Sequence, residues 1–113
     1  MMSDQEQKRM RKAAEKAVKG LKTCKDIVAT LERRHIQGVP MDIWNCPLAR
    51  YLSDAIGASV WVNAKALGVR LGFESMNVLT LPRHLQEFVR LFDQGSFPQL
   101  NECEDREREV HYD

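Results

Sequence analysis

The sequence predicts an α+β protein in which a long N-terminal helix precedes a small α-β-β-β-α core with a short antiparallel sheet. Three observations lead to this fold class. An apolar repeat of about 3.5 residues fills the first third of the chain, alternating apolar residues fill the middle, and a helical apolar stripe follows Pro82. Helices on one face of a small antiparallel sheet bury such a set of elements economically.

The first element is a helix expected over residues 4–37. Ser3 and Glu6 form an S-x-x-E capping box at its start, and Gly38 followed by Pro40 marks its end. Small and apolar residues recur within it at alternate spacings of four and three, which keeps one seam of a helix against a partner helix. This seam consists of Met10, Ala14, Ala17, Leu21, Cys24, Val28, Leu31 and His35.

A helix of that length would extend about 50 Å at 1.5 Å per residue. The roughly 60 residues that remain for the core are too few to cover such a rod along its whole length. The seam therefore predicts self-association, most simply as a coiled-coil homodimer. Ala14 and Ala17 would allow two helices to approach closely, while Leu21, Val28 and Leu31 would supply most of the burial.

The core begins with a second helix, expected from Pro47 to Gly57. Asn45 is the candidate polar cap, because its side chain can accept a hydrogen bond from an unpaired N–H of the first turn. Proline suits the first helical position, where its missing N–H has no partner, and glycine ends the helix.

Three strands and a last helix complete the core. Alternating apolar positions predict strands over residues 59–63, 67–71 and 76–81, arranged as a meander. Pro82 opens the last helix and Gly95 ends it. Its apolar stripe consists of Leu85, Phe88, Val89 and Phe92.

Charge divides the chain into three parts: the helix at 1–38, the core at 39–100 and an acidic tail at 101–113. The net charge of +1 conceals this polarity. Residues 1–36 carry ten Lys or Arg against five acids, a net +5, whereas residues 99–113 carry two Arg against six acids, a net −4. So acidic a tail, with few apolar residues, is expected to be disordered or weakly docked.

Composition also bounds the location of the protein. No apolar run approaches the roughly 18 residues of a membrane span, and the charged N-terminus has no apolar signal core. Cys24, Cys46 and Cys103 are odd in number and widely spaced, which favours reduced thiols over a disulfide framework. These features predict a cytoplasmic protein that does not contact a membrane.

Two segments of the core carry a resemblance. Residues 46–52 read CPLARYL and residues 88–100 read FVRLFDQGSFPQL. They resemble a group of small uncharacterised actinobacterial and actinophage proteins with a C-P-x-A-x-Y-L start and an F-D-x-G-x-[FY]-P-x-L end. The resemblance covers residues 44–100 and implies no activity. It implies that the first helix and the tail are appended to a recurring core, in a phage or mobile-element setting.

Candidate catalytic groups are few. Cys46 lies at a predicted helix N-terminus, where a thiol pKa is lowered, but neither His35 nor His84 is spaced to act as its base. The sequence has no C-x-x-C or H-x-x-x-H pair for a metal and no phosphate-binding glycine loop. We therefore expect no catalytic residue, no metal, no cofactor and no enzymatic activity.

Nucleic-acid binding is the alternative function. Basic residues are spread along the first helix on the side opposite the seam, which suits contact with phosphates as well as plain solvation. These candidate contacts are Lys8, Arg9, Arg11, Lys12, Lys16 and Lys19, with Lys22 and Lys25 beyond them. The acidic tail opposes such binding, and the basic region has no aromatic residues on which single strands could stack.

The function that the sequence favours is a non-enzymatic protein–protein interaction module. It would self-associate through the first helix and act on an unknown protein, in keeping with an accessory role in a phage or mobile element. A large aromatic side chain left exposed near an element edge would anchor a partner. The candidates for that anchor are Trp44, Trp61, Phe73 and Phe97.

Overall fold

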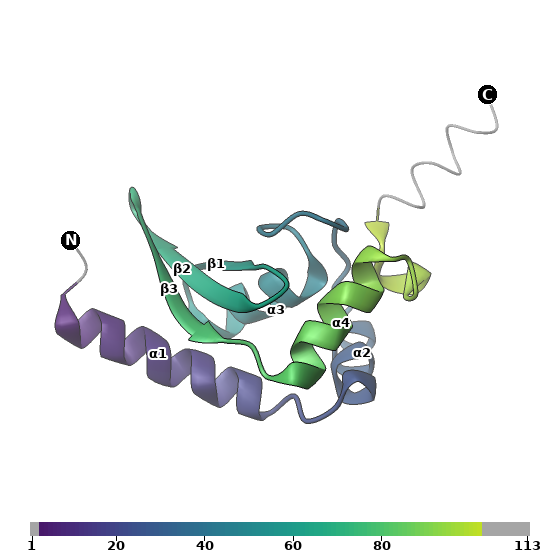
Figure 1. The fold of residues 1–113 in the computed structure, drawn as a ribbon, viewed down its shortest axis with the longest axis horizontal. Helices are drawn as coiled ribbons and strands as arrows, with labels where there is room; N and C mark the ends of the chain where they lie inside the picture. Colours follow the sequence, from purple (N-terminus) through teal and green to yellow (C-terminus); the bar gives the residue numbers. More distant parts are fainter. Residues whose placement is uncertain (1–2, 103–113) are drawn as a thin grey trace.

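The computed structural model describes residues 3–102 of the 113. In this part of the chain, four helices, a 3-10 turn and a three-stranded antiparallel sheet form an α+β fold (Figure 1). The elements in order are α1 (Asp4–Lys19), α2 (Cys24–Arg33), α3 (Pro47–Ile56), β1 (Ser59–Val62), β2 (Ala66–Leu71), β3 (Glu74–Thr80), α4 (Arg83–Asp93) and η1 (Pro98–Leu100).

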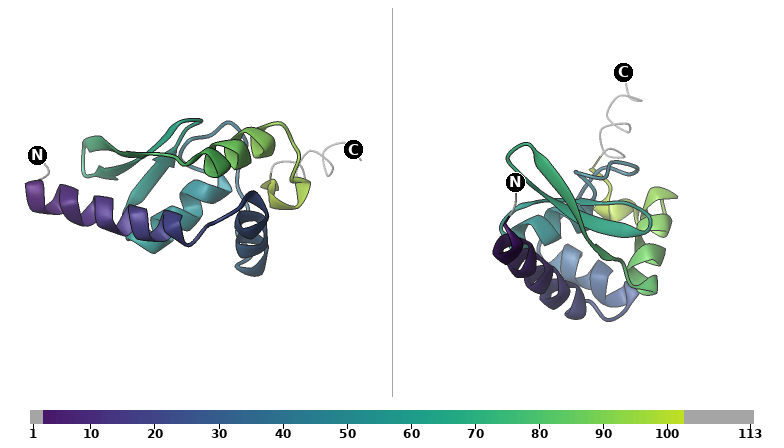
Figure 2. Two further views of the ribbon diagram at one scale, coloured as in Figure 1. Left: turned by 60° about the horizontal axis from the view of Figure 1, so that its bottom comes forward. Right: turned by 60° about the vertical axis from the view of Figure 1, so that its left-hand side comes forward.

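Two helices replace the single helix expected over residues 4–37, so that expectation is corrected. Helix α1 ends with Gly20 as its C-cap, and α2 begins after Thr23. The Thr23 side-chain oxygen accepts a hydrogen bond from the backbone N–H of Asp26 at 3.0 Å, which makes Thr23 an N-cap in the middle of the predicted helix. The two helices consequently run in different directions (Figure 2).

Of the two predicted ends of the 4–37 helix, only the N-terminal one is confirmed. The capping box is present, since Ser3 Oγ accepts from the Glu6 N–H at 3.2 Å and the Glu6 carboxylate accepts from the Ser3 N–H. At the other end, His35 adopts a left-handed φ of 57° and the chain leaves the helix before Gly38. Gly38 is buried, and a Cβ there would lie 2.4 Å from the carbonyl oxygen of Asn45.

Helix α3 forms as the sequence predicts, with one difference at its start. Proline occupies the first turn, and Gly57 ends the helix with a left-handed φ of 79°. The cap is Cys46 rather than Asn45, because the Cys46 Sγ accepts the hydrogen bond from the Ala49 N–H at 3.4 Å.

The sheet is a meander in the order β1-β2-β3, as the alternating pattern predicts. Val60 and Val69 are paired across β1 and β2 and are buried on the same face. A bulge after Leu67 shifts the register of β3, and Val78 is buried there. Helices α1 and α3 pack against this inner face, while the opposite face has no helix over it (Figure 2).

The turn between β2 and β3 projects at the end of the molecule where α1 begins (Figure 1). It is a two-residue turn of Gly72 and Phe73, in which Gly72 supplies a positive φ of 62°. The Phe73 side chain is fully exposed at its tip.

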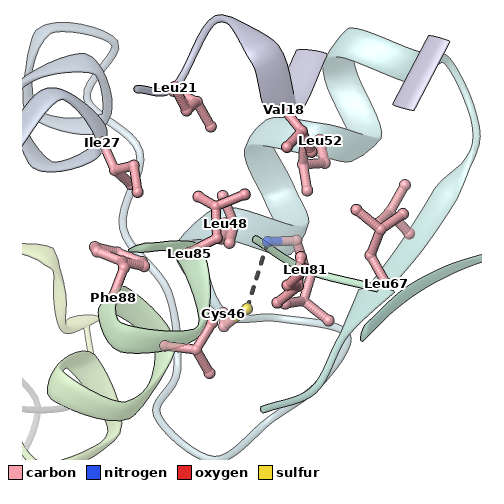
Figure 3. Close-up of a cluster of buried hydrophobic side chains, with 14 of the residues drawn as sticks. Val18, Leu21, Ile27, Cys46, Leu48, Leu52, Leu67, Leu81, Leu85 and Phe88 are labelled. Atoms are coloured by element: carbon pink, nitrogen blue, oxygen red, sulfur yellow. Dashed lines mark hydrogen bonds between the residues drawn. The ribbon is translucent and has the colours of Figure 1, made fainter. Parts of the chain in front are cut away.

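One hydrophobic core joins all four helices to the sheet. Helix α2 packs on α4. The Nε2–H of His84 donates to the Leu21 carbonyl at 2.5 Å, and this hydrogen bond links the α1–α2 connection to the start of α4. Figure 3 shows core side chains from α1, α2, α3, the sheet and α4 meeting around Leu85. The labelled members are Val18, Leu21, Ile27, Cys46, Leu48, Leu52, Leu67, Leu81, Leu85 and Phe88.

The last described residues are fixed to the body of the fold. Arg50 donates to both carboxylate oxygens of Glu102, at 2.9 and 3.2 Å, and to the carbonyl of Gln37 at 2.7 Å. The N–H of Gly38 donates to the Leu100 carbonyl at 2.8 Å. The expectation about the acidic tail falls mainly on residues 103–113, which lie outside the described residues.

Candidate interaction surfaces

The seam predicted for self-association faces the interior of the same chain. Its large apolar members pack on α3, α4 and the sheet, and the burial pattern follows two short helices rather than one heptad repeat. Met10, Ala14, Leu21 and Leu31 are buried, Ala17, Cys24 and Val28 are half-buried, and His35 is exposed. Four of the eight seam residues are thus covered before any second chain arrives.

The four candidate aromatic anchors divide into two pairs. Trp61 lies over Gly68 on the open face of the sheet, and its indole N–H donates to the Ser75 hydroxyl at 2.8 Å. Phe97 is half-buried and stacks on Phe88, with ring centroids 5.4 Å apart. Both of these side chains serve the fold. The two exposed anchors are Trp44, at 37%, and Phe73, at 101%.

The loop at 39–46 carries the other exposed apolar side chains. Met41 is 83% exposed and Ile43 is 42% exposed, directly before Trp44. Asp42 fixes this loop from within: its carboxylate accepts the N–H groups of Trp44 and Asn45, both at 3.0 Å, together with the Asn45 side-chain amide. These hydrogen bonds, the Asn45 side chain first, hold the pKa of Asp42 below its ordinary value.

Met41 is held in a conformation that an L-residue rarely adopts. Its φ is 59°, in the left-handed region, and its N–H donates to a carboxylate oxygen of Asp93 on α4 at 2.9 Å. A non-glycine residue in that region costs on the order of 1 kcal/mol. The loop thus carries backbone strain at the position that presents its most exposed apolar side chain.

A shallow groove of about 680 Å³ lies between Met41 and α4. Its apolar walls are Met41, Ala64 and Val89, and its rim carries two arginines and two acids from α4. The rim residues are Arg83, Gln86, Glu87, Arg90, Asp93 and Gln94. Protein contact surfaces combine an apolar anchor and an apolar pocket with a polar, charged rim. Met41, the groove and the α4 side chains have this combination.

The predicted basic contacts all lie on the exposed surface of α1, and Lys22 and Lys25 are exposed beyond it. At 100° per residue, five of them fall within an arc of about 100° opposite the buried face. We call this set the α1 basic stripe: Lys8, Arg9, Lys12, Lys16 and Lys19. Arg11 lies outside the arc, nearer the core.

Cys46 has the environment of a structural thiol. Burial raises the pKa of the Cys46 thiol to about 11, although the backbone N–H groups of Ala49 and Leu48 lower it. Figure 3 shows its sulfur directed at the first turn of α3, among core side chains. A thiol with that pKa stays protonated near neutral pH, so it is a poor nucleophile. Among the described residues, no group of three His, Cys, Asp or Glu side chains is placed to hold a metal ion.

No protein family, curated protein or solved structure matches this chain. Within residues 3–102, no helix has the length and apolarity to cross a membrane.

Met41 and the groove beside it are not among the sites that the sequence predicts. Residues 39–46 have no apolar periodicity, and the groove joins residues about fifty positions apart, such as Met41 and Asp93. One signal was present in the sequence: Met41, Ile43 and Trp44 are apolar residues in a segment with no helical or strand pattern. Only Trp44 is among the anchors that the sequence predicts.

Proposed function

We propose that this chain is a non-enzymatic protein–protein interaction module whose contact surface is the 39–46 loop and the outer face of α4. The observation that carries the proposal is Met41, which is 83% exposed and held by Asp93 in a strained conformation beside an apolar groove. We do not propose the N-terminal seam for this role, since Met10, Leu21 and Leu31 are buried in the core.

The occupant proposed for this surface is a second copy of the chain. In a two-fold dimer the same patch faces itself, so a protrusion and a groove must lie side by side on each copy. Met41 and the groove between it and α4 meet that requirement, because each Met41 would enter the groove of the other copy.

The charges along α4 are self-complementary as well. Its exposed stripe reads Arg83, Glu87, Arg90 and Gln94, spaced by about one helical turn. When two such helices pair antiparallel about an axis near residues 88 and 89, Glu87 of each copy faces Arg90 of the other. The same register places Arg83 opposite Gln94, so no like charges meet.

Interface size supports the use of both elements. A stable interface buries about 800 Å² on each partner. The three exposed apolar side chains of the 39–46 loop are too few for that area, so the outer face of α4 is needed with them. An accessory role in a phage or mobile element, acting on a host protein, rests on the family resemblance alone and remains an expectation.

The experiment is the mass of the full chain measured by sedimentation over a wide range of concentration. Met41→Gly tests the surface, because glycine removes the side chain and adopts a positive φ without strain. Phe73→Gly is the matched control, since it also removes one exposed apolar side chain, at the tip of the β2–β3 turn.

We expect a concentration-dependent dimer that Met41→Gly weakens and Phe73→Gly leaves unchanged. Met41→Gly should leave the thermal stability of the monomer unchanged or raise it. A chain that stays monomeric at the highest concentration, or a dimer that tolerates Met41→Gly, would overturn the proposal.

A further inference from the structure

The outer face of α1 carries five exposed cations that the proposed dimer leaves uncovered. The α1 basic stripe runs from Lys8 to Lys19 over about 16 Å of helix, at 1.5 Å per residue. None of its five members has a salt bridge to another described residue. Glu15 flanks the stripe, and the other acids of α1 lie in its first turn.

The fold orients this stripe firmly. The opposite face of α1 is fixed by Met10, Ala14 and Val18, all buried in the core against α3 and the sheet. The cations therefore point to solvent whether or not a ligand is bound, and α1 does not have to refold to present them.

A membrane is a poor fit to this surface. Basic helices that bind lipid lay an apolar face into the bilayer below their cations, but the apolar face of α1 is occupied by the core. A protein partner is also a poor fit, because the stripe has no aromatic or large apolar side chain to act as an anchor.

Nucleic acid fits better. Duplex DNA carries one phosphate charge per about 1.7 Å of its axis, so a cationic row about 16 Å long meets enough phosphates to pair each cation. Lysine binds phosphate as a mobile point charge, without the geometry that base recognition demands. Single strands are less suited, since stacking platforms are absent from the α1 basic stripe.

We propose that the outer face of α1 binds the phosphate backbone of double-stranded DNA without sequence preference, through Lys8, Arg9, Lys12, Lys16 and Lys19. The site is on α1, whereas the proposed dimer surface is the 39–46 loop and the outer face of α4, so the two surfaces share no residue. The net charge of the whole chain is only +1, which makes the local charge of this stripe, rather than the overall charge, the determinant of binding.

The test is fluorescence anisotropy of a short labelled duplex titrated with the full chain at several salt concentrations. Five phosphate contacts predict a slope of log affinity against log salt of about −4.5, or a loss of roughly 500-fold between 50 and 200 mM salt. Two duplexes of unrelated sequence should bind equally well.

A pair of double variants separates the stripe from net charge. Lys12→Gln with Lys16→Gln removes two stripe cations, whereas Arg33→Gln with Lys65→Gln removes two exposed cations outside α1. The first pair should lower affinity at low salt by about tenfold or more and reduce the salt slope by about 2. The second pair should change both values little.

Four results would overturn the proposal. These are no binding by the full chain at low salt, equal losses in the two double variants, a preference for single strands of the same length, and binding to vesicles of anionic lipid in place of the duplex. None of these results bears on the dimer, which the sedimentation experiment measures separately.

Discussion

Helix α1 and the 39–46 loop place their apolar side chains in opposite environments. Met10, Ala14 and Val18 of α1 are buried and leave a basic surface outside, whereas Met41 in the loop extends into solvent from a strained backbone. The regular element thus builds the core, and the irregular one holds the exposed apolar surface. Apolar periodicity therefore indicates which face of a helix is covered, but not which chain covers it.

The largest change in the free energy of unfolding is expected from a charge placed in the hydrophobic core. Leu21→Asp should lower the free energy of unfolding by more than about 3 kcal/mol, because Leu21 is 2% exposed and a carboxylate there has no partner. Met41→Asp is the control, since the same charge on the loop is solvated. Urea unfolding of both variants measures the difference. A stably folded Leu21→Asp variant that merely changes in mass would restore the N-terminal seam as the dimer contact.

A second effect concerns pH. The folded state raises the pKa of Cys46 from 9.0 to about 11, so it holds the thiol proton more tightly than the unfolded chain does. The resulting stability is fully present below about pH 9 and is lost as pH rises towards 11. The loss should be on the order of 2–3 kcal/mol. Unfolding free energies measured from about pH 8 to 11 should fall more steeply in the native chain than in Cys46→Ser. Parallel curves for the two proteins would contradict the raised pKa of the buried thiol.

The smallest effect compares the N-caps of α1 and α2. Thr23→Ala removes the cap of α2 at the connection between α1 and α2 and should cost about 1 kcal/mol, whereas Ser3→Ala removes the cap at the start of α1 and should cost less. Thermal unfolding compares the two variants. Equal losses would mean that the α1–α2 connection is no more important to the fold than the start of α1.

Much of the fold followed from local signals. The capping box at Ser3, the proline at the start of α3, the left-handed Gly57 and Gly95 and the alternation of the three strands all rest on neighbouring residues. The break after Gly20 did not, although Thr23 and Asp26 offered a cap signal, because the apolar repeat continued through it in an apparently unbroken register.

The candidate site was harder to predict from the sequence. Burial of Leu21 and Leu31 depends on α3 and α4, which lie far along the chain, and the groove depends on a contact between Met41 and Asp93. Neither contact has a signature in local spacing. The basic residues of α1 were found at once, since their exposure follows from the same helical geometry that buries Met10 and Ala14.

Reciprocal charge exchange tests whether the chain meets a second copy through the 39–46 loop and α4. Glu87→Arg alone would set the new guanidinium against Arg90 of the other copy, and Arg90→Glu alone would set the new carboxylate against Glu87 of the other copy. Each variant by itself should therefore sediment as a monomer under conditions where the native chain is a dimer. An equimolar mixture restores both ion pairs in one heterodimer, so its mass should return to that of the dimer. Variants that dimerise alone, or a mixture that remains monomeric, would contradict a dimer formed through the 39–46 loop and α4.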